Sequence, residues 1–269
     1  MSTPAIALKV PALRRTAAAS ANPARREGGS IGPAKAQCSA CNLRELCLPC
    51  GLNAADMAAF SDAIYTRKRI GRGETLLRSG QEFESVYAVR AGFFKSSVVL
   101  EDGREQVTGF HMAGDIVGMD GIGTESHTTD VAALEDSEVC IIPYARLQEA
   151  GMQRQLHKAM SRELVRGQGV MMLLGTMRAE ERLAAFLLNL SQRFGARGFS
   201  PSEFRLRMTR AEIGSHVGLA LETVSRLFSR FESDGLITAR QKDIRIHDIP
   251  GLKALVLQVT TRTSHAGYL

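Results

Sequence analysis

The stretch that decides the fold runs from Thr209 to Phe228 and reads TRAEIGSHVGLALETVSRLF. Thr209 and Glu212 have the spacing of a capping box, which predicts that a helix begins there. Gly218 predicts a turn between this helix and a second one. The positions expected to be buried are apolar: Leu219, Val224 and Leu227. Two short helices joined by a tight turn are typical of a helix-turn-helix.

The outer face of the second helix carries Glu222, Ser225 and Arg226, which stand at positions i, i+3 and i+4. Arginine can hold guanine O6 and N7, and glutamate can accept a hydrogen bond from cytosine N4. We expect these three side chains to contact DNA in the major groove. We also expect the small Ala211 to lie where the two helices cross.

The residues that follow predict a wing, because 237–240 and 243–246 are two short runs of strand-forming residues. The charge distribution agrees with a polyanionic partner for this part of the chain. Residues 178–269 hold fourteen basic and nine acidic residues, whereas residues 37–177 hold fourteen basic and eighteen acidic ones. The carboxy-terminal third is therefore predicted to be a winged helix-turn-helix that binds double-stranded DNA.

From Tyr65 to Pro143 the pattern changes to short apolar or alternating runs separated by glycines. Residues 86–89 and 93–100 are predicted strands, and the Asp-Gly pair within 101–104 predicts a hairpin turn. Many short strands at regular spacing indicate an antiparallel barrel or sandwich. A short helix over residues 53–63, with Asn53 as its N-cap, is expected before it.

Residues 152–177 then have helical periodicity. The apolar or small positions step by four and three residues, as in a coiled-coil seam: Met160, Leu164, Gly167, Met171 and Leu174. The seam predicts a dimerisation helix, and the alternative is a helix that packs on its own domain. Gly167 and Gly169 either allow two helices to approach closely or loosen the middle of the seam. A further helix, with one apolar face, is expected over residues 179–194.

Four of the five cysteines lie in residues 38–50, which read CSACNLRELCLPC, and the fifth is Cys140. This usage indicates a metal or iron–sulfur site in a reducing compartment. The four clustered cysteines alone have the spacing Cys-x2-Cys-x5-Cys-x2-Cys, which would also suit a zinc ion. In that case Cys140 would be a buried thiol of the core.

The sequence contains no run of about 18 apolar residues, so no transmembrane helix is predicted. Residues 1–36 hold six basic residues and one acidic residue, and Pro, Ala, Ser and Gly dominate them. A disordered basic tail is therefore favoured over a targeting peptide.

With these motifs together, the chain resembles the FNR branch of the cyclic-AMP receptor superfamily, whose members are oxygen-responsive regulators in bacteria. The resemblance covers about residues 37–250. Besides the cysteines and the helix 221–226, its motifs are GFHMAGD at 109–115, VCIIP at 139–143 and EERLAAF at 180–186. The resemblance implies an α+β fold with a cyclic-nucleotide-binding-like antiparallel β-roll, a long dimerisation helix and a carboxy-terminal winged helix-turn-helix. The expected divisions are 1–36 for the tail, 37–52 for the cluster-binding segment, 53–150 for the sensor domain, 151–177 for the dimerisation helix and 178–269 for the DNA-binding domain.

The resemblance also implies a cofactor and partners. By position, a [4Fe–4S] cluster would be bound by Cys38, Cys41, Cys47 and Cys140. An intact cluster would stabilise a cytoplasmic homodimer on a palindrome of TTGAT half-sites, and oxygen would convert the cluster and release the DNA. The turn at 101–104 matches a turn that contacts RNA polymerase in relatives, although a solvated hairpin tip is an equal alternative.

Two features depart from the family pattern. Cys50 stands where many relatives have an apolar residue, so it is a spare ligand or part of a zinc site. Relatives often place an acidic residue in the middle of the seam, where like charges make dimerisation conditional. Gly167 and Gly169 occupy that region here, so oxygen control of the dimer is expected to be looser.

Two other classes of protein are disfavoured. A cyclic-nucleotide-binding regulator needs a cation for the phosphate, yet residues 114–133 contain no Arg or Lys. That branch also has an arginine where this chain has Leu221. An enzyme is disfavoured because no phosphate loop, nucleophile elbow or zinc-protease motif is present. His111 and His127 are candidate catalytic or haem-binding residues, although a structural role is favoured for both.

Overall fold

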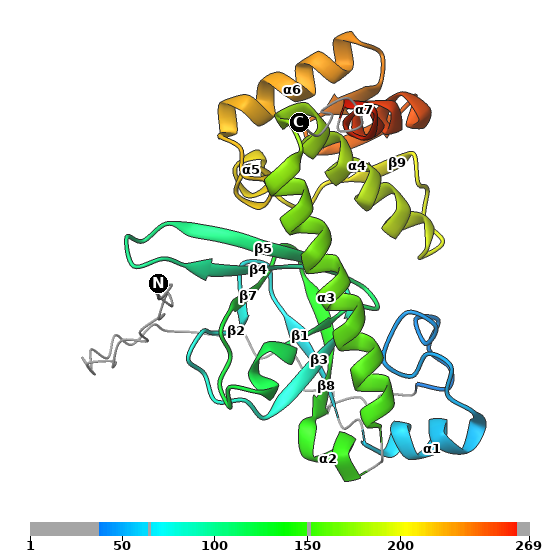
Figure 1. Ribbon diagram of the computed structural model, residues 1–269. Coiled ribbons are helices and arrows are strands. Elements are labelled where there is room, and N and C mark those ends of the chain that lie inside the picture. Colours follow the sequence, from blue (N-terminus) through cyan, green and yellow to red (C-terminus); the bar gives the residue numbers. More distant parts are fainter. Residues whose placement is uncertain (1–37, 64–65, 150–151, 263–269) are drawn as a thin grey trace, which may run out of the picture. The chain divides into compact units, whose positions relative to one another are not determined.

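The computed structural model describes residues 38–63, 66–149 and 152–262, all within one compact unit of residues 33–269 (Figure 1). The predicted basic tail lies outside the described residues. No helix in the described part of the chain is long and apolar enough to cross a membrane.

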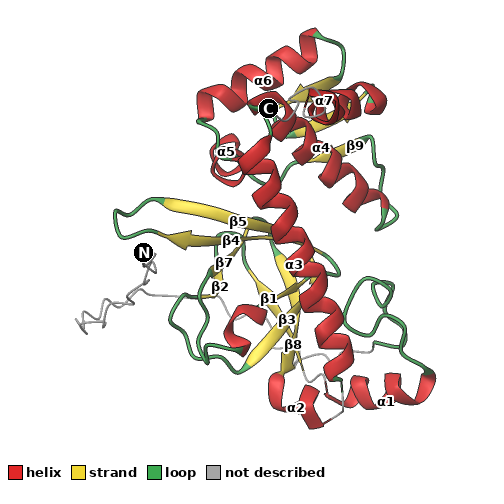
Figure 2. Ribbon diagram, in the orientation of Figure 1, coloured by secondary structure: helices red, strands yellow, loops and turns green. Residues whose placement is uncertain are grey.

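Two antiparallel four-stranded sheets form the first part of the fold, drawn in yellow in Figure 2. The first sheet has the order β1-β8-β3-β6. Its strands are β1 (Thr66–Ile70), β8 (Ser137–Pro143), β3 (Ser85–Ala91) and β6 (Ile116–Val117). The second has the order β2-β7-β4-β5. Its strands are β2 (Thr75–Leu77), β7 (Asp130–Ala133), β4 (Phe93–Val99) and β5 (Glu105–Met112). A short 3₁₀ helix, η1 (Met119–Ile122), follows β6. The predicted antiparallel β-roll is confirmed.

The first sheet is buried on both faces, because successive strand residues point to opposite sides. Val89 and Val139 point to the apolar core between the two sheets. Ala88 and Ile142 point to a second apolar cluster on the other face. Cys140 is partly buried against this second cluster, so β8 presents its cysteine on the outer face of the sheet.

Segments from outside the sheets cover that outer face. Helices α1 (Ala54–Ala63), α2 (Tyr144–Glu149) and the start of α3 (Gln153–Thr176) lie there with residues 38–50. The predicted cap of α1 is confirmed, since Asn53 Oδ1 accepts a hydrogen bond of 2.9 Å from the Asp56 amide. The predicted hairpin is confirmed as well: Leu100 N donates to Arg104 O at 2.8 Å, and Gly103 has the positive φ of 82° that this turn requires.

The carboxy-terminal part is a winged helix-turn-helix, as predicted. It comprises α4 (Ala179–Gly195), β9 (Glu203–Arg205), α5 (Arg210–Val217), α6 (Leu221–Ser233), β10 (Ile237–Arg240), β11 (Asp243–Ile246) and α7 (Ile249–Arg262). Its three-stranded sheet has the order β10-β11-β9. The apolar face of α4 is buried in the core of this part together with Ile213, Val224 and Phe231.

The capping box of Thr209 and Glu212 is present, and Gly218 has the left-handed φ of 65° that ends α5. The expected place of closest approach between the two helices was wrong, because Ala211 is exposed. The position without room for a side chain is Gly214, where a Cβ would collide with the carbonyl oxygen of Leu219 in the turn between α5 and α6. The turn therefore needs a glycine one helical turn before Gly218.

Candidate functional site

The cysteine segment follows a series of tight turns. Cys41 N donates to Cys38 O at 3.2 Å, Cys47 N to Leu43 O at 3.0 Å, and Cys50 N to Cys47 O at 3.3 Å. Leu48, only 1% exposed, anchors the segment in the apolar cluster on the outer face of the first sheet. These turns bring the amino-terminal cysteines over strands β3 and β8.

One cavity unites the cysteines that the resemblance selects. Cys38, Cys41, Cys47 and Cys140 all line it, together with the end of β3. Cys50 does not line this cavity, although it lies only three residues after Cys47. The structure thus brings Cys140, about ninety residues away in sequence, to the three earlier cysteines and leaves Cys50 apart.

The cavity favours neutral thiols as long as nothing binds them. Burial raises the pKa of Cys38 to about 11 and that of Cys47 to about 12. The pKa of Cys140 is also raised, chiefly by burial, while the charges of Arg90 and Arg67 act in the opposite direction. All five cysteines are free thiols. Binding a metal or cluster would therefore displace protons, as is usual for buried thiolate ligands.

Arginines at and near the cavity make it suitable for an anionic group: Arg44 and Arg90 line it, and Arg67 lies on the neighbouring strand β1. Arg90 Nη1 lies 3.5 Å from Cys41 Sγ as a hydrogen-bond donor. Arg67 stands directly opposite Cys140 in the β1–β8 pairing, and its Nε atom is buried with no hydrogen-bond partner. A buried donor without a partner is costly. An iron–sulfur cluster held by thiolates is negatively charged, so the donor set and its surroundings fit such a group.

A single metal ion is the alternative to a cluster. Within residues 38–63, 66–149 and 152–262, no three His, Cys, Asp or Glu side chains gather closely enough to hold one ion. Four thiolates around one zinc ion must all lie about 2.3 Å from it. In a four-iron cluster each thiolate binds a different iron, so the cysteines stand farther apart around a larger group.

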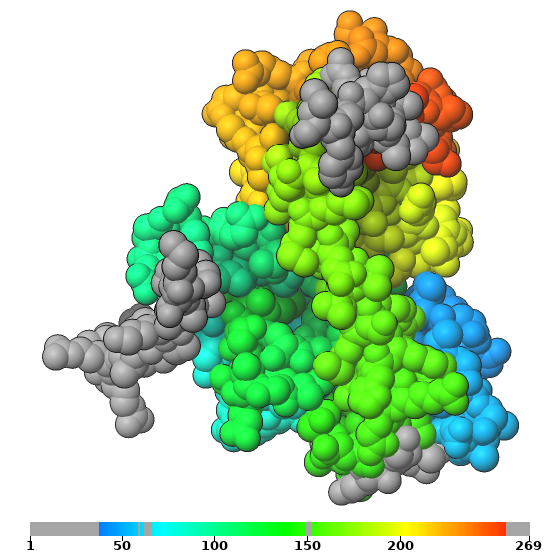
Figure 3. Space-filling view, in the orientation of Figure 1, coloured from blue at the N-terminus to red at the C-terminus, as the bar shows by residue number. Residues whose placement is uncertain are grey.

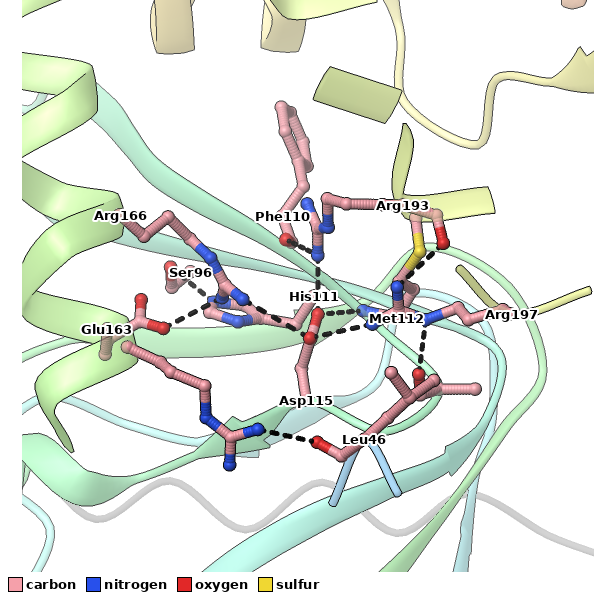
Figure 4. A network of polar contacts seen from close by, with 12 residues as sticks. Leu46, Ser96, Phe110, His111, Met112, Asp115, Glu163, Arg166, Arg193 and Arg197 are labelled. Carbon is pink, nitrogen blue, oxygen red and sulfur yellow. Dashed lines mark hydrogen bonds and ion pairs between the residues drawn. The ribbon is translucent and has the colours of Figure 1, made fainter. Parts of the chain in front are cut away.

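A network of polar contacts joins the cysteine segment to helices α3 and α4 (Figure 4). Its centre is Asp115, which is 8% exposed and follows strand β5. Its carboxylate accepts hydrogen bonds from Arg197 Nη2 at 2.9 Å, from Arg166 Nη2 at 3.4 Å and from Arg193 Nη2. The three guanidinium groups hold the pKa of the Asp115 carboxyl below its usual value despite burial. One carboxylate therefore ties the end of β5 to α3 through Arg166, to α4 through Arg193, and to the turn after α4 through Arg197.

The cysteine segment touches the same network at Leu46, the neighbour of Cys47. Arg162 Nη1 of α3 donates to Leu46 O at 3.3 Å. Gly114 has a φ of 91°, and a Cβ there would come within 2.8 Å of Leu46 Cβ. This network was not predicted from the sequence. Gly114 and Asp115 appeared only as part of a family motif, and the arginines are far from them in the chain.

The loop after strand β6 is not built to bind a phosphate. Asp120 Oδ2 accepts hydrogen bonds from the amides of Thr128 and Thr129, at 2.7 and 3.0 Å, and from both hydroxyls. His127 Nδ1 lies 3.2 Å from Asp120 Oδ1. The carboxylate of Asp120 therefore already accepts the hydrogen bonds that this loop could donate to a ligand. Its negative charge would also repel an anionic ligand.

The two candidate histidines are placed as structural residues. His127 is 2% exposed and is held by Asp120. His111 is buried with its Nε2 atom 3.0 Å from Ser96 Oγ, and burial lowers its pKa to about 4. A group with that pKa is neutral at neutral pH.

The predicted DNA-contacting residues share the outer face of α6. Glu222, Ser225 and Arg226 are exposed, whereas Val224 and Phe228 on the opposite side are buried. Arg226 makes one weak contact, from Nη2 to Thr223 Oγ1 at 3.4 Å, so its guanidinium is available to a ligand.

The predicted seam is exposed along most of α3, which lies at the surface in Figure 3. Leu164 and Met171 are 64% and 65% exposed, and Met160 and Gly167 are exposed as well. Leu174 is partly buried and packs close to Gly218. An apolar stripe of this kind is unusual on the surface of a monomer.

The comparisons with known proteins cover both parts of the fold. A cyclic nucleotide-binding domain matches residues 67–154, and a Crp-like helix-turn-helix domain matches residues 181–255. The transcriptional regulatory protein btr of Bordetella pertussis is 45% identical over 85% of this chain and 96% of its own length. The transcriptional activator protein FnrA of Stutzerimonas stutzeri is 47% identical over 82% of this chain and 93% of its own.

Among solved structures, FixK2 of Bradyrhizobium japonicum is similar, with a TM-score of 0.66 and 30% identity over 71% of this chain and 96% of that one. The relatives are named transcriptional regulators, not enzymes. On this evidence the chain belongs to the CRP/FNR family of transcription regulators, whose helix-turn-helix binds DNA.

Proposed function

We propose that this regulator senses oxygen through a [4Fe–4S] cluster held by Cys38, Cys41, Cys47 and Cys140, and that it controls genes of anaerobic or microaerobic metabolism. The observation that carries the proposal is the convergence of these four cysteines on one cavity. Arg90, which lines the same cavity and donates to Cys41 Sγ, supports an anionic group there. The occupied loop around Asp120 disfavours a cyclic nucleotide as the signal.

The zinc alternative is less well supported. It needs Cys50 as a ligand together with the three earlier cysteines, but Cys50 lies outside their cavity and Cys140 lies inside it. Zinc would also leave the signal unexplained, because zinc has no redox chemistry. The cluster supplies that chemistry when bound, and the chain contributes thiolates, charge and a partly buried setting.

The proposed signal route starts at the cysteine segment. Leu46 contacts Gly114 and accepts a hydrogen bond from Arg162 of α3. A change at Cys47 would therefore move a neighbour of Asp115, whose partners include Arg166 of α3 and Arg193 of α4. Those two helices lead into the proposed dimer seam and the DNA-binding domain.

We propose that the exposed face of α3 pairs with a second copy of the chain. Replacing Leu164 with Glu is expected to weaken the dimer of the anaerobic protein by about a hundredfold, because two charges would be buried in an apolar seam. Sedimentation of the cluster-loaded protein measures the effect. Ser161→Glu, which adds the same charge to an exposed position off the seam, is the control. An unchanged dimer constant for Leu164→Glu would place the interface elsewhere.

We propose that Glu222, Ser225 and Arg226 contact TTGAT half-sites of a two-fold palindrome. Removing Arg226 as Arg226→Ala is expected to lower operator affinity by about ten- to hundredfold, as for loss of a two-pronged contact to a base. Fluorescence anisotropy with operator and scrambled DNA measures it, and iron content should stay normal. Lys253→Ala, which removes one positive charge from the exposed surface of α7 (Ile249–Arg262), is the control. Unchanged operator affinity for Arg226→Ala would contradict the assignment.

Air exposure tests the function as a whole. Operator affinity of the anaerobic protein should fall after air enters, and scrambled DNA should bind equally weakly before and after. We also propose that the protein is cytoplasmic and that its domains divide at the residues predicted from the sequence. The exposed hairpin at 101–104 is proposed to contact RNA polymerase.

A further inference from the structure

We propose that Arg67 and Arg90 form a cationic pair that offsets the negative charge of the cluster and slows its oxidation by oxygen. This inference rests on the proposed function, because it assigns roles to two residues around the proposed cluster. Neither residue is a ligand, and neither lies in a motif that the sequence analysis singled out.

Arg90 is held against the cysteines by a second contact. Its Nη1 atom lies 3.5 Å from Cys41 Sγ, and its Nε atom lies 3.1 Å from Glu138 Oε2. The side chains of Arg90 and Glu138 are 29% and 27% exposed, so the pair is only partly solvated. Glu138 therefore positions the guanidinium with one edge toward the thiol, and Arg90 itself lines the cavity.

Arg67 approaches from the other side of Cys140. The sheet pairs Cys140 with Arg67 on β1 and with Ala88 on β3. Residues directly opposite each other in a sheet point to the same face, so Arg67 points to the outer face that carries the cavity. The Nε atom of Arg67 is buried without a hydrogen-bond partner, whereas the guanidinium of Arg90 contacts both Cys41 and Glu138. The charge of Arg67 acts on both Cys38 and Cys140.

The charges explain why two cations would be retained there. A [4Fe–4S]²⁺ core bound by four thiolates has a formal charge of about −2, and burial makes such a charge costly. The positive charges of Arg67 and Arg90 offset this negative charge. The carboxylate of Glu138, which pairs with Arg90, reduces that effect in part.

A nearby charge should change the ease of cluster oxidation in a predictable direction. When oxygen takes one electron from the cluster, the cluster becomes more positive and oxygen becomes superoxide. A nearby cation opposes that loss, because it stabilises the more negative state. Removing the cation should make the cluster easier to oxidise, and removing the neighbouring anion should make it harder.

Three variants test this with the full-length protein loaded with its cluster under anoxia. Arg90→Gln is expected to raise the rate of cluster loss in air by about threefold to tenfold, followed as the decay of visible absorption. Glu138→Gln keeps a hydrogen-bond acceptor for Arg90 but removes the negative charge, so it should slow the loss. The midpoint potential of the cluster should move down in Arg90→Gln and up in Glu138→Gln. Arg90→Lys keeps the charge and should restore most of the lifetime.

Lys68→Gln is the matched control. It removes one positive charge from the same strand as Arg67, at an exposed position that points to the opposite face. Its decay rate and potential should equal those of the unmodified protein. A merely structural role would be shown if Arg90→Gln and Glu138→Gln both shortened the lifetime, and equal lifetimes in all variants would also overturn the proposal. If the unmodified protein forms no cluster, the proposed function fails first, and that outcome is separate from these.

Discussion

Asp115→Asn is expected to lower the free energy of unfolding of the cluster-free protein by about 3–5 kcal/mol. The substitution keeps the size and most of the shape of the side chain but removes the charge that three guanidinium groups share. Arg193 and Arg197 are themselves largely buried, so their charges would be left without compensation in a poorly solvated place. Urea unfolding followed by far-ultraviolet circular dichroism under anoxia measures the loss.

A surface carboxylate provides the control for this change. Asp102 pairs with Arg104 at the tip of the β4–β5 hairpin, where both side chains are more than half exposed. Asp102→Asn should therefore cost less than about 1 kcal/mol. If Asp115→Asn cost no more than this, the arginines would be hydrated well enough to need no partner, and the network would not be a strong link between β5 and the helices.

Cys140→Ser is expected to abolish cluster binding while the protein stays folded. Iron and sulfide in the anaerobically reconstituted protein should fall from about four per chain to near zero, because a serine hydroxyl is a poor replacement for a thiolate ligand. The fold should survive, since the substitution changes one atom in a partly buried position. Circular dichroism of the same sample checks that point.

Cys50→Ser is the matched comparison for that prediction. Cys50 is in the same stretch of turns but outside the cavity, so its loss should leave iron and sulfide unchanged. The reverse result, with the cluster retained in Cys140→Ser and lost in Cys50→Ser, would make Cys50 the fourth ligand.

Local signals explain what could be predicted of the fold. The capping box at Thr209, the glycine turn at Gly218 and the Asp-Gly hairpin each depend on neighbours within about four residues, and all three are present. The packing of α5 against the following turn depends on tertiary contacts: the sequence predicts a close approach at Ala211, but Ala211 is exposed and the small residue required is Gly214. A small residue is visible in a sequence, but the direction that it faces is set by tertiary packing.

In the long helix α3, too, local sequence predicts some features and tertiary packing sets the others. Its periodicity predicted both its extent and an apolar stripe, and the two interpretations of that stripe apply to different parts of it. Leu156 and Ala159, in its first turns, are buried, and Ala159 packs in the apolar cluster on the outer face of the first sheet, as expected of a helix that packs on its own domain. From Leu164 to Met171 the stripe is exposed and available to a partner. Periodicity alone does not show where one part ends and the other begins.

The site was less predictable than the fold. Cysteine spacing left Cys50 and Cys140 as rival ligands, and family resemblance selected Cys140, which strand pairing places beside the other three. The network around Asp115 joins residues separated by fifty to eighty positions. No short-range pattern marks contacts of that kind, because they arise only when the β-roll and the helices pack together.

The most direct test of the central claim is a visible absorption spectrum with iron, sulfide and zinc analysis of protein purified without oxygen, repeated after exposure to air. The account predicts about four irons and four sulfides per chain, with a colour that bleaches in air. About one zinc per chain and no colour would contradict it, because the cysteines would then be structural and the signal would have to reach the protein elsewhere.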